Sequence, residues 1–328
     1  MFSKFKSSIQ KYKKSILMQE KAVTQALGAL ERIEARLDAL KGSNLPSPQP
    51  LSKAVPPDFD PAMYLALNRD VAAAGLDPIE HFVNSGFSEG RFYKPSYAQD
   101  GLLTVHDSSF RNEASFSRAY SRGLAANEQI EFNWHWRFHV GLWAARCASR
   151  LPGDFVECGV NRGFLSSGIM EDLNWDTLGR TFWLLDTFSG IDTDGVSSEE
   201  NDPGALERNK KHFGSGLYSS DLESIRANFA QWENTRIIVG AVPGTLDSIT
   251  SEQIAFASID MNTAPPEVAA MEFLWPRLVP GAMVVLDDYA YHGYRNQKLA
   301  MDDFAARHDT SILSLPTGQG LIVRPPAH

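Results

Sequence analysis

The second half of this 328-residue chain predicts an α/β fold built on a Rossmann-like, mostly parallel sheet. Apolar runs of strand length alternate there with segments of helical period, which is the pattern of strand–helix–strand units. Several of these runs end on an acidic residue, at the edge where the carboxyl ends of parallel strands face a ligand. The last two runs, 311–315 and 321–324, flank the turn 317–320 and predict a closing antiparallel hairpin.

The first predicted strand ends in a glycine turn. The apolar run reaches Glu157 and is followed by Gly159 and Gly163, after which a helix begins. Glycines at such a turn let backbone N–H groups approach a small polar ligand, and Asn161 between them tolerates a left-handed backbone. Because Glu157 stands where a dinucleotide fingerprint requires its first glycine, the pattern favours S-adenosylmethionine over NAD. An ordinary strand–turn–helix without a ligand is the alternative.

A second apolar run, 181–188, carries an acidic residue about one helix after the first. In a doubly wound sheet the acidic residue at this position binds a ribose. We therefore predict Asp186 as the ribose ligand.

Two later runs, 254–260 and 283–288, end at Asp260 and at Asp287 with Asp288. An amphipathic helix between them makes a parallel unit whose carboxyl ends are neighbours. Carboxylates so close need a compensating cation, and hard oxygen ligands suit Mg²⁺. A polar strand end that leads into a loop is the alternative for the Asp287–Asp288 pair. The apolar stripe of the helix is predicted to comprise Val268, Met271, Leu274, Trp275 and Leu278.

From about residue 151 to 325 the chain resembles the macrocin O-methyltransferase family, which are Mg²⁺-dependent sugar O-methyltransferases. The motifs Val-Glu-Cys-Gly-Val, Leu-Asp-Thr-Phe-Ser-Gly, Ile-Asp-Met and Leu-Asp-Asp-Tyr occur in the family's order. The resemblance implies a class I methyltransferase sheet that uses S-adenosylmethionine to methylate a sugar hydroxyl of a glycan or glycosylated metabolite. The implied cofactor contacts are Glu157, Gly159, Asn161, Gly163, Asp186 and, beside the adenine, Gly240; the implied metal ligands are Asp260, Asp287 and Asp288.

Catalysis in such a site is expected to depend on the metal and a base. Mg²⁺ bound to two vicinal sugar oxygens would lower the pKa of one and orient it. His292 is the histidine closest in sequence to the proposed metal, and we predict it, with Asp260, as catalytic. His135 and His139, in a segment that could cover the site, are alternatives. Relatives often carry a further acidic residue shortly after the first metal ligand, whereas Asp260 is followed by Met-Asn-Thr-Ala-Pro, so substrate-side contacts are expected to differ.

Composition places the protein in a reducing, aqueous compartment. Its two cysteines give no disulfide framework and no metal-binding spacing. Neither a long apolar run nor a signal peptide is evident, which predicts a cytoplasmic protein. The net charge of −9 argues against a general nucleic-acid binder, because phosphate contacts need a basic face.

Residues 1–41 have the pattern of a coiled-coil helix. Apolar residues recur every seven positions from Phe2 to Leu37, with a second series from Phe5 to Leu40 that only Gln19 interrupts. This predicts a homo-oligomer. The first half of the segment is rich in lysine, so peripheral contact with anionic lipid at the inner membrane face is a further hypothesis beside a solvated basic surface.

Three further segments precede the predicted catalytic domain 151–328. Residues 42–57 form a Pro-rich linker, and residues 58–95 predict a small module of two or three short helices, punctuated by Asp-Pro and Gly. The module resembles short modules of bacterial surface-polysaccharide proteins. Residues 96–150 are predicted to supply connecting or lid helices, and the Gly- and Ser-rich segment 191–220 a loop that covers the substrate.

Two rival functions remain at this point. One is a non-catalytic scaffold in surface-polysaccharide assembly with a degenerate methyltransferase domain, which the intact acidic residues disfavour. The other is an oxidoreductase on the same sheet, which Glu157 at the first glycine position disfavours.

Overall fold

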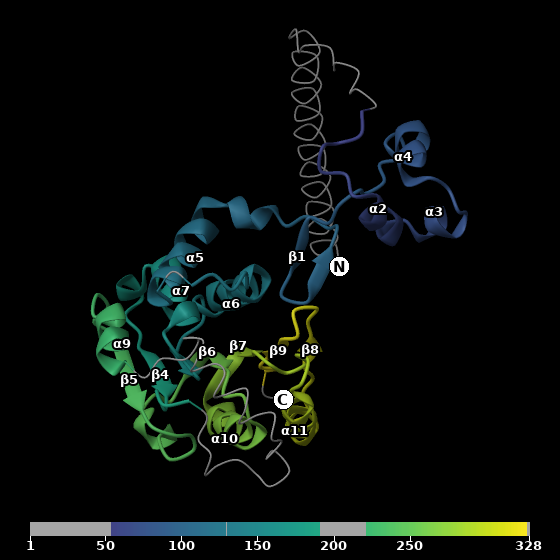
Figure 1. Cartoon of the computed structure of the whole chain (residues 1–328). Coiled ribbons are helices and arrows are strands. Elements are labelled where there is room, and N and C mark those ends of the chain that lie inside the picture. Colours follow the sequence, from purple (N-terminus) through teal and green to yellow (C-terminus); the bar gives the residue numbers. More distant parts are fainter. Residues whose placement is uncertain (1–53, 129, 191–220, 327–328) are drawn as a thin grey trace, which may run out of the picture. The chain divides into compact units, whose positions relative to one another are not determined.

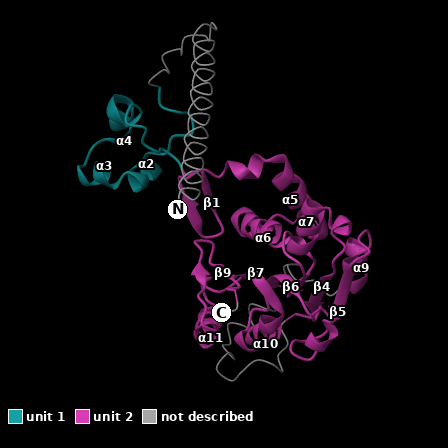
Figure 2. Ribbon diagram, turned by 180° about the vertical axis from the view of Figure 1, so that it is seen from behind, with its two compact units in different colours: residues 1–94 teal, residues 95–328 magenta. Residues whose placement is uncertain are grey.

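The computed structural model describes residues 54–128, 130–190 and 221–326. The chain divides into two compact units, residues 1–94 and 95–328 (Figure 2). The predicted coiled coil 1–41, most of the predicted linker and the predicted covering loop 191–220 lie outside the described residues. None of the described helices is long and apolar enough to cross a membrane.

The described part of the smaller unit is a set of short helices around an aromatic core. Asp60 and Asp77 cap helices that begin with proline, and each carboxylate accepts backbone N–H groups of the first turn. Tyr64, Val71 and Phe82 are buried together, and the hydroxyl of Tyr64 lies 2.9 Å from Nδ1 of His81. The elements are α2 (Pro61–Leu67), α3 (Arg69–Ala73), α4 (Pro78–His81) and the π-turn η1 (Phe82–Gly86).

The larger unit contains a seven-stranded sheet in the order β5-β4-β3-β6-β7-β9-β8 (Figure 1). The strands pair in parallel except β9, which is antiparallel to β7 and to β8. This confirms the predicted Rossmann-like class I methyltransferase sheet and its closing hairpin. The strands are β3 (Asp154–Cys158), β4 (Phe182–Asp186), β5 (Thr235–Val239), β6 (Ile254–Ile259), β7 (Leu278–Leu286), β8 (Leu313–Ser314) and β9 (Gly320–Val323).

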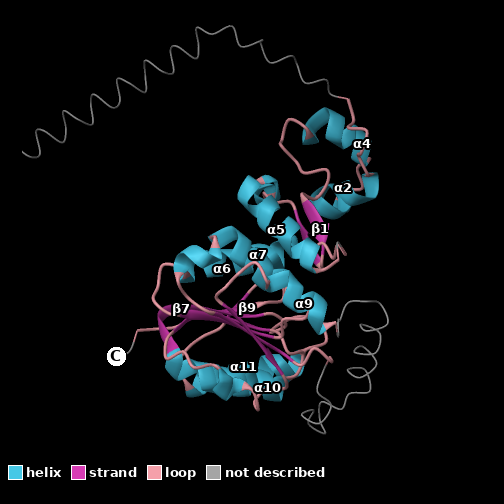
Figure 3. Cartoon of the chain, turned by 90° about the vertical axis from the view of Figure 1, so that its left-hand side faces the viewer, coloured by secondary structure: helices cyan, strands magenta, loops and turns pink. Residues whose placement is uncertain are grey.

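Helices cover both faces of the sheet (Figure 3). On one face α5 and α6 pack on α7, and on the other α10 packs on α11. Burial on both faces explains why β3, β4 and β6 are continuous apolar runs rather than alternating ones. The helices are α5 (Ala114–Ala126), α6 (His135–Ala148), α7 (Phe164–Leu173), α9 (Leu222–Phe229), α10 (Ala264–Leu274) and α11 (Arg295–Arg307).

Two local details differ from the sequence-based expectations. Helix α10 ends at Leu274, and a 3-10 turn that contains Pro276 follows, so Leu278 begins β7 instead of extending the helical stripe. The segment 96–150 contains, besides its helices, a hairpin of β1 (Tyr97–Gln99) and β2 (Leu102–Thr104) that was not predicted.

Candidate functional site

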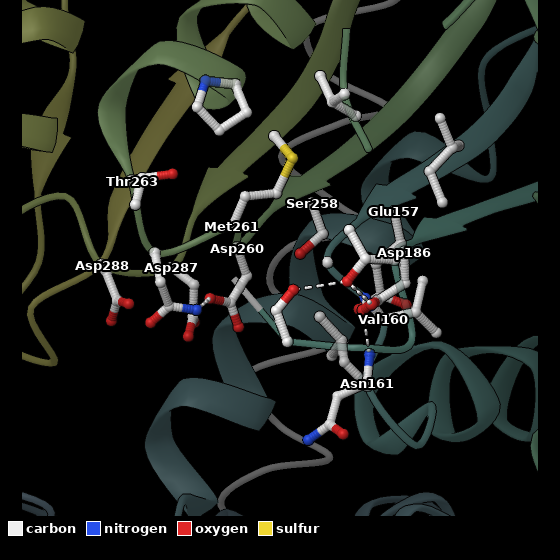
Figure 4. A pocket seen from close by; sticks show the side chains of 18 of the residues that line it. Glu157, Val160, Asn161, Asp186, Ser258, Asp260, Met261, Thr263, Asp287 and Asp288 are labelled. Carbon is white, nitrogen blue, oxygen red and sulfur yellow. Dashed lines mark hydrogen bonds between the residues drawn. The ribbon is translucent and has the colours of Figure 1, made fainter. Parts of the chain in front are cut away.

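A cavity of about 520 Å³ lies at the carboxyl ends of β3, β4, β5, β6 and β7. Its wall also includes residues of α6 and of the loops after β4 and β7. Figure 4 shows carboxylates at two places along this wall, with Glu157 and Asp186 at one and Asp260, Asp287 and Asp288 at the other. All five line the cavity, which is where an open α/β sheet binds its ligands.

Glu157 is the next-to-last residue of β3, and only 4% of its surface is exposed. Burial raises the pKa of its carboxyl to about 8, because little water remains to stabilise the charge. Within the described residues its Oε2 has no hydrogen-bond partner. An orphaned buried carboxylate oxygen in a cavity wall is suited to a cationic ligand group, which would satisfy the oxygen and stabilise the charge.

The two glycines of the turn serve packing. A Cβ on Gly159 would come within 1.7 Å of the carbonyl oxygen of Asp260, and one on Gly163 within 2.4 Å of the Phe229 ring. Gly159 lines the cavity, whereas Gly163 is not among the lining residues. The glycines therefore let neighbouring parts of the chain approach each other, and their contact with a ligand stays a prediction. Asn161 has the predicted left-handed backbone, with φ of 49°.

Asp186 ties the turn after β3 to the turn after β4. Its Oδ2 accepts the backbone N–H groups of Val160 and Asn161, each over 2.7 Å (Figure 4). Its Oδ1 accepts the backbone N–H of Phe188 over 2.7 Å. The carboxylate thus orders the turn while it lines the cavity. Gly240 lies just beyond β5, where its N–H donates to the carbonyl oxygen of Asp186, and it also lines the cavity.

The three predicted metal ligands lie at the ends of two neighbouring strands and line the same cavity. Ile259 pairs in parallel with Leu286, so Asp260 and Asp287 follow at neighbouring strand ends. Burial and the charge of Asp287 raise the pKa of Asp260 well above its ordinary value and that of Asp288 to about 6. The negative charges of this cluster are therefore incompletely compensated.

Arg137, on the first turn of α6, is a cation that contacts this cluster. Its Nη2 donates to the carboxylate of Asp287, to Oδ1 of Asp288 over 3.1 Å and to the carbonyl oxygen of Asp287 over 2.9 Å. Burial opposes its charge, but Asp287 and Asp288 outweigh burial and raise the pKa of Arg137 above its ordinary value. From β9, Gln319 Nε2 donates to Oδ1 of Asp287 over 2.9 Å.

The donor set suits Mg²⁺, but the side chains are not arranged to ligate it. Three carboxylates face one guanidinium, and their hard oxygens are the donors that Mg²⁺ prefers. Yet in the described part of the chain no three His, Cys, Asp or Glu side chains form a group that could hold a metal ion.

The turn after Asp260 is held by neighbouring side chains. Asn262 Nδ2 donates to Oδ1 of Asp260 over 3.2 Å, and Tyr294 donates its hydroxyl to Oδ1 of Asn262 over 2.9 Å. Buried Glu267 accepts the N–H of Met261 over 3.2 Å. An amide therefore lies two residues beyond Asp260, on the part of the wall formed by Met261, Asn262 and Thr263.

Comparison with known proteins assigns a family to the part of the chain that forms the sheet. Residues 143–313 match the model of the family Macrocin-O-methyltransferase (TylF). The chain belongs to this family. The match covers the strands β3 to β7 and all five cavity carboxylates.

Two curated proteins are similar to this member of the macrocin O-methyltransferase family. The 8-demethyl-8-(2,3-dimethoxy-alpha-L-rhamnosyl)-tetracenomycin-C 4'-O-methyltransferase of Streptomyces olivaceus is 32% identical over 171 residues, which are 50% of this chain and 62% of that protein. The mycinamicin III 3''-O-methyltransferase of Micromonospora griseorubida is 25% identical over 169 residues, 49% of this chain and 63% of that protein. The chain thus spans less than two thirds of the curated relatives it matches. Among solved structures, the O-methyltransferase NovP is similar with a TM-score of 0.48 and 25% identity, over 58% of this chain and 79% of NovP.

None of the three histidines considered as a base is among the residues that line the cavity. His292 is exposed and is not among the residues that line the cavity. His135 stacks on Tyr120 with ring centroids 4.6 Å apart, and His139 stacks on Phe110 at 4.0 Å. The geometry therefore gives no support to a histidine base, and of the two predicted catalytic residues Asp260 is the one in the cavity wall.

Sequence reasoning missed Arg137 and Gln319. A signal for Arg137 was present, because a charged residue within the aromatic run 134–138 is unusual on a helix that packs against a core. Gln319 lies in a turn between two glycines and gives no comparable signal.

Proposed function

We propose that this protein is an S-adenosylmethionine- and Mg²⁺-dependent O-methyltransferase that acts on a sugar hydroxyl of a glycan or glycosylated metabolite. The single observation that carries the proposal is the pairing, in one cavity, of a buried carboxylate with an orphaned oxygen at Glu157 and an acid cluster at Asp260, Asp287 and Asp288. The name of the Streptomyces olivaceus relative, a 4'-O-methyltransferase of a rhamnosyl-tetracenomycin, supports the acceptor class.

The residues at Glu157 would bind the cofactor, whose sulfonium supplies the methyl group. Glu157 would accept the ammonium of the methionine part, whose positive charge would lower the pKa of the buried carboxyl and offset the cost of ionising it. Asp186 would accept a ribose hydroxyl with the lone pairs left by its backbone contacts. Gly240, after β5, would lie beside the adenine.

The acid cluster would bind the metal, which as a Lewis acid lowers the pKa of a sugar hydroxyl and orients it. Of the three carboxylates, we expect Asp260 to lie nearest the acceptor, because Asn262 and Met261 extend the cavity wall directly beyond it. The apolar part of that wall, with Tyr291 and Tyr294, offers ring faces for a sugar.

The proposal is tested by methyl transfer from labelled S-adenosylmethionine to a panel of rhamnosyl glycosides. Transfer should stop with EDTA and return with Mg²⁺, and Asp260→Asn should remain inactive with the metal present. Undiminished transfer in EDTA, or by the Asp260→Asn variant, contradicts the metal role. No observation favours the scaffold alternative, and Glu157 argues against an oxidoreductase.

A further inference from the structure

We infer that Arg137 is a resident counter-ion of the acid cluster, and that a divalent cation binds there by displacing its guanidinium from Asp287 and Asp288. The inference rests on the proposed metal dependence and adds to it a competing cation from the chain itself. Metal affinity would then be set by the release of a buried ion pair as well as by the three carboxylates.

Arg137 occupies carboxylate oxygens that a metal would need. One nitrogen, Nη2, contacts the Asp287 carboxylate, the Asp288 carboxylate and the Asp287 carbonyl oxygen. The other carboxylate oxygen of Asp287 accepts from Gln319. Asp287 therefore has both oxygens engaged, and it can ligate a metal through Oδ2 only after Arg137 has moved.

The charge of Arg137 balances only part of the negative charge of the three carboxylates. Its side chain is 10% exposed and that of Asp288 is 7% exposed, so water screens the pair weakly. Among the described residues, the single charge of Arg137 faces the three carboxylates Asp260, Asp287 and Asp288, and a dication would compensate the cluster better.

A second acidic partner, Asp100, is available to the displaced guanidinium. It already lies over the ring of Tyr291, 4.7 Å from the centroid, and the hydroxyl of Tyr291 donates to Oδ1 of Asp100 over 3.2 Å. Asp100, in the turn between β1 and β2, is a half-buried carboxylate; burial raises its pKa, and the charge of Arg137 acts in the opposite direction. By shifting along the tyrosine ring, the guanidinium of Arg137 would leave Asp287 and Asp288 and approach Asp100.

The test is calorimetric titration of Mg²⁺ into the full-length wild type, Arg137→Gln and a matched control, Arg146→Gln. Arg146 lies on the same helix and makes a two-point ion pair with Asp172, at 2.6 and 2.8 Å, away from the cavity. We expect Arg137→Gln to bind Mg²⁺ about tenfold more tightly or better, because a repelling charge within a few ångströms of the ion is gone. Arg146→Gln should bind as the wild type does.

A second measurement does not depend on the folding of a variant. Phenylglyoxal modification of the wild type, followed by peptide mass spectrometry, should increase at Arg137 when Mg²⁺ is added and stay constant at Arg146. Equal or weaker Mg²⁺ affinity in Arg137→Gln, or modification of Arg137 that Mg²⁺ does not increase, overturns the inference.

Titration of S-adenosylhomocysteine in the same series separates this inference from the proposed function. Normal S-adenosylhomocysteine binding with no gain in Mg²⁺ affinity in Arg137→Gln removes the inference and leaves methyl transfer standing. A tighter metal site in a protein that does not bind S-adenosylhomocysteine supports the inference and contradicts the proposed function.

Discussion

Gly159 and Asp260 lie in contact through their backbones, so closely that a Cβ on Gly159 would meet the Asp260 carbonyl oxygen at 1.7 Å. The contact follows from the parallel pairing of β3 with β6, in which the N–H of Asp260 donates to the carbonyl oxygen of Cys158 over 2.8 Å. It brings the turn of the proposed cofactor site against the first residue of the acid cluster. The two halves of the cavity therefore depend on one glycine.

This contact predicts that Gly159→Ala damages both halves at once. The variant must open the β3–β6 strand ends and also adopt a φ of 90°, so we expect a loss of about 1–3 kcal/mol in the free energy of unfolding and weaker binding of S-adenosylhomocysteine. Urea unfolding and calorimetry measure the two effects. Gly179→Ala is the control, because Gly179 also has positive φ but no atom lies within 4 Å of its Cβ position. Equal losses in the two variants would show that backbone strain alone is responsible.

Glu157→Gln is expected to stabilise the ligand-free protein in a defined pH range. The folded-state pKa of Glu157 is raised from 4.5 to about 8, so the unfolded chain ionises first as the pH rises. The wild type should therefore lose stability relative to the variant between about pH 4.5 and 8, by about 2–5 kcal/mol at the upper end. Urea unfolding of both proteins from pH 4 to 8.5 measures this. A difference that does not change with pH contradicts the burial of an ionisable carboxyl at this position.

Asp186→Ala should weaken the cofactor site in two ways. Loss of the proposed ribose hydrogen bonds would cost about 1.5–3 kcal/mol of S-adenosylhomocysteine binding. Loss of the acceptor for the N–H groups of Val160 and Asn161 would also lower the free energy of unfolding. Calorimetry measures the affinity for S-adenosylhomocysteine, and urea unfolding measures the free energy of unfolding. Unchanged affinity in a destabilised variant would show that Asp186 orders the turn and does not bind the ribose.

The sequence was sufficient for the sheet and for the acidic residues at its edge. Long apolar runs that end in acid specify parallel strands and place the acids at one edge, and no other long-range fact is needed to bring Asp260 beside Asp287. Local pattern misplaced the end of α10, because Leu278 continues the apolar period beyond Pro276, which stops the helix.

The remaining parts of the site depend on contacts between distant segments. Arg137 meets Asp287 across 150 positions and Gln319 reaches it from β9, and such pairings leave no periodic trace in the chain. The contact of Gly159 with the backbone of Asp260 is likewise a pairing of distant segments, which the spacing of the glycines does not reveal.

Residues 1–41, outside the described residues, remain a predicted coiled coil. Six heptads of apolar residues would leave a continuous stripe in water without a second helix, at roughly 25 cal/mol per Å². Deletion of the segment should lower the mass found by light scattering without preventing S-adenosylhomocysteine binding. If the full-length protein is already a monomer at micromolar concentration, the coiled coil is excluded, and binding of the basic stretch to anionic liposomes becomes the next test.

Calorimetric titration of the wild type and Glu157→Gln with S-adenosylhomocysteine, and separately with NAD⁺, tests the central claim most directly. We expect one S-adenosylhomocysteine to bind per wild-type chain, with an affinity that EDTA does not change. Glu157→Gln should lower this affinity about tenfold or more, and NAD⁺ should not bind. Binding of NAD⁺ without S-adenosylhomocysteine, or S-adenosylhomocysteine affinity that is the same in both proteins, would contradict it.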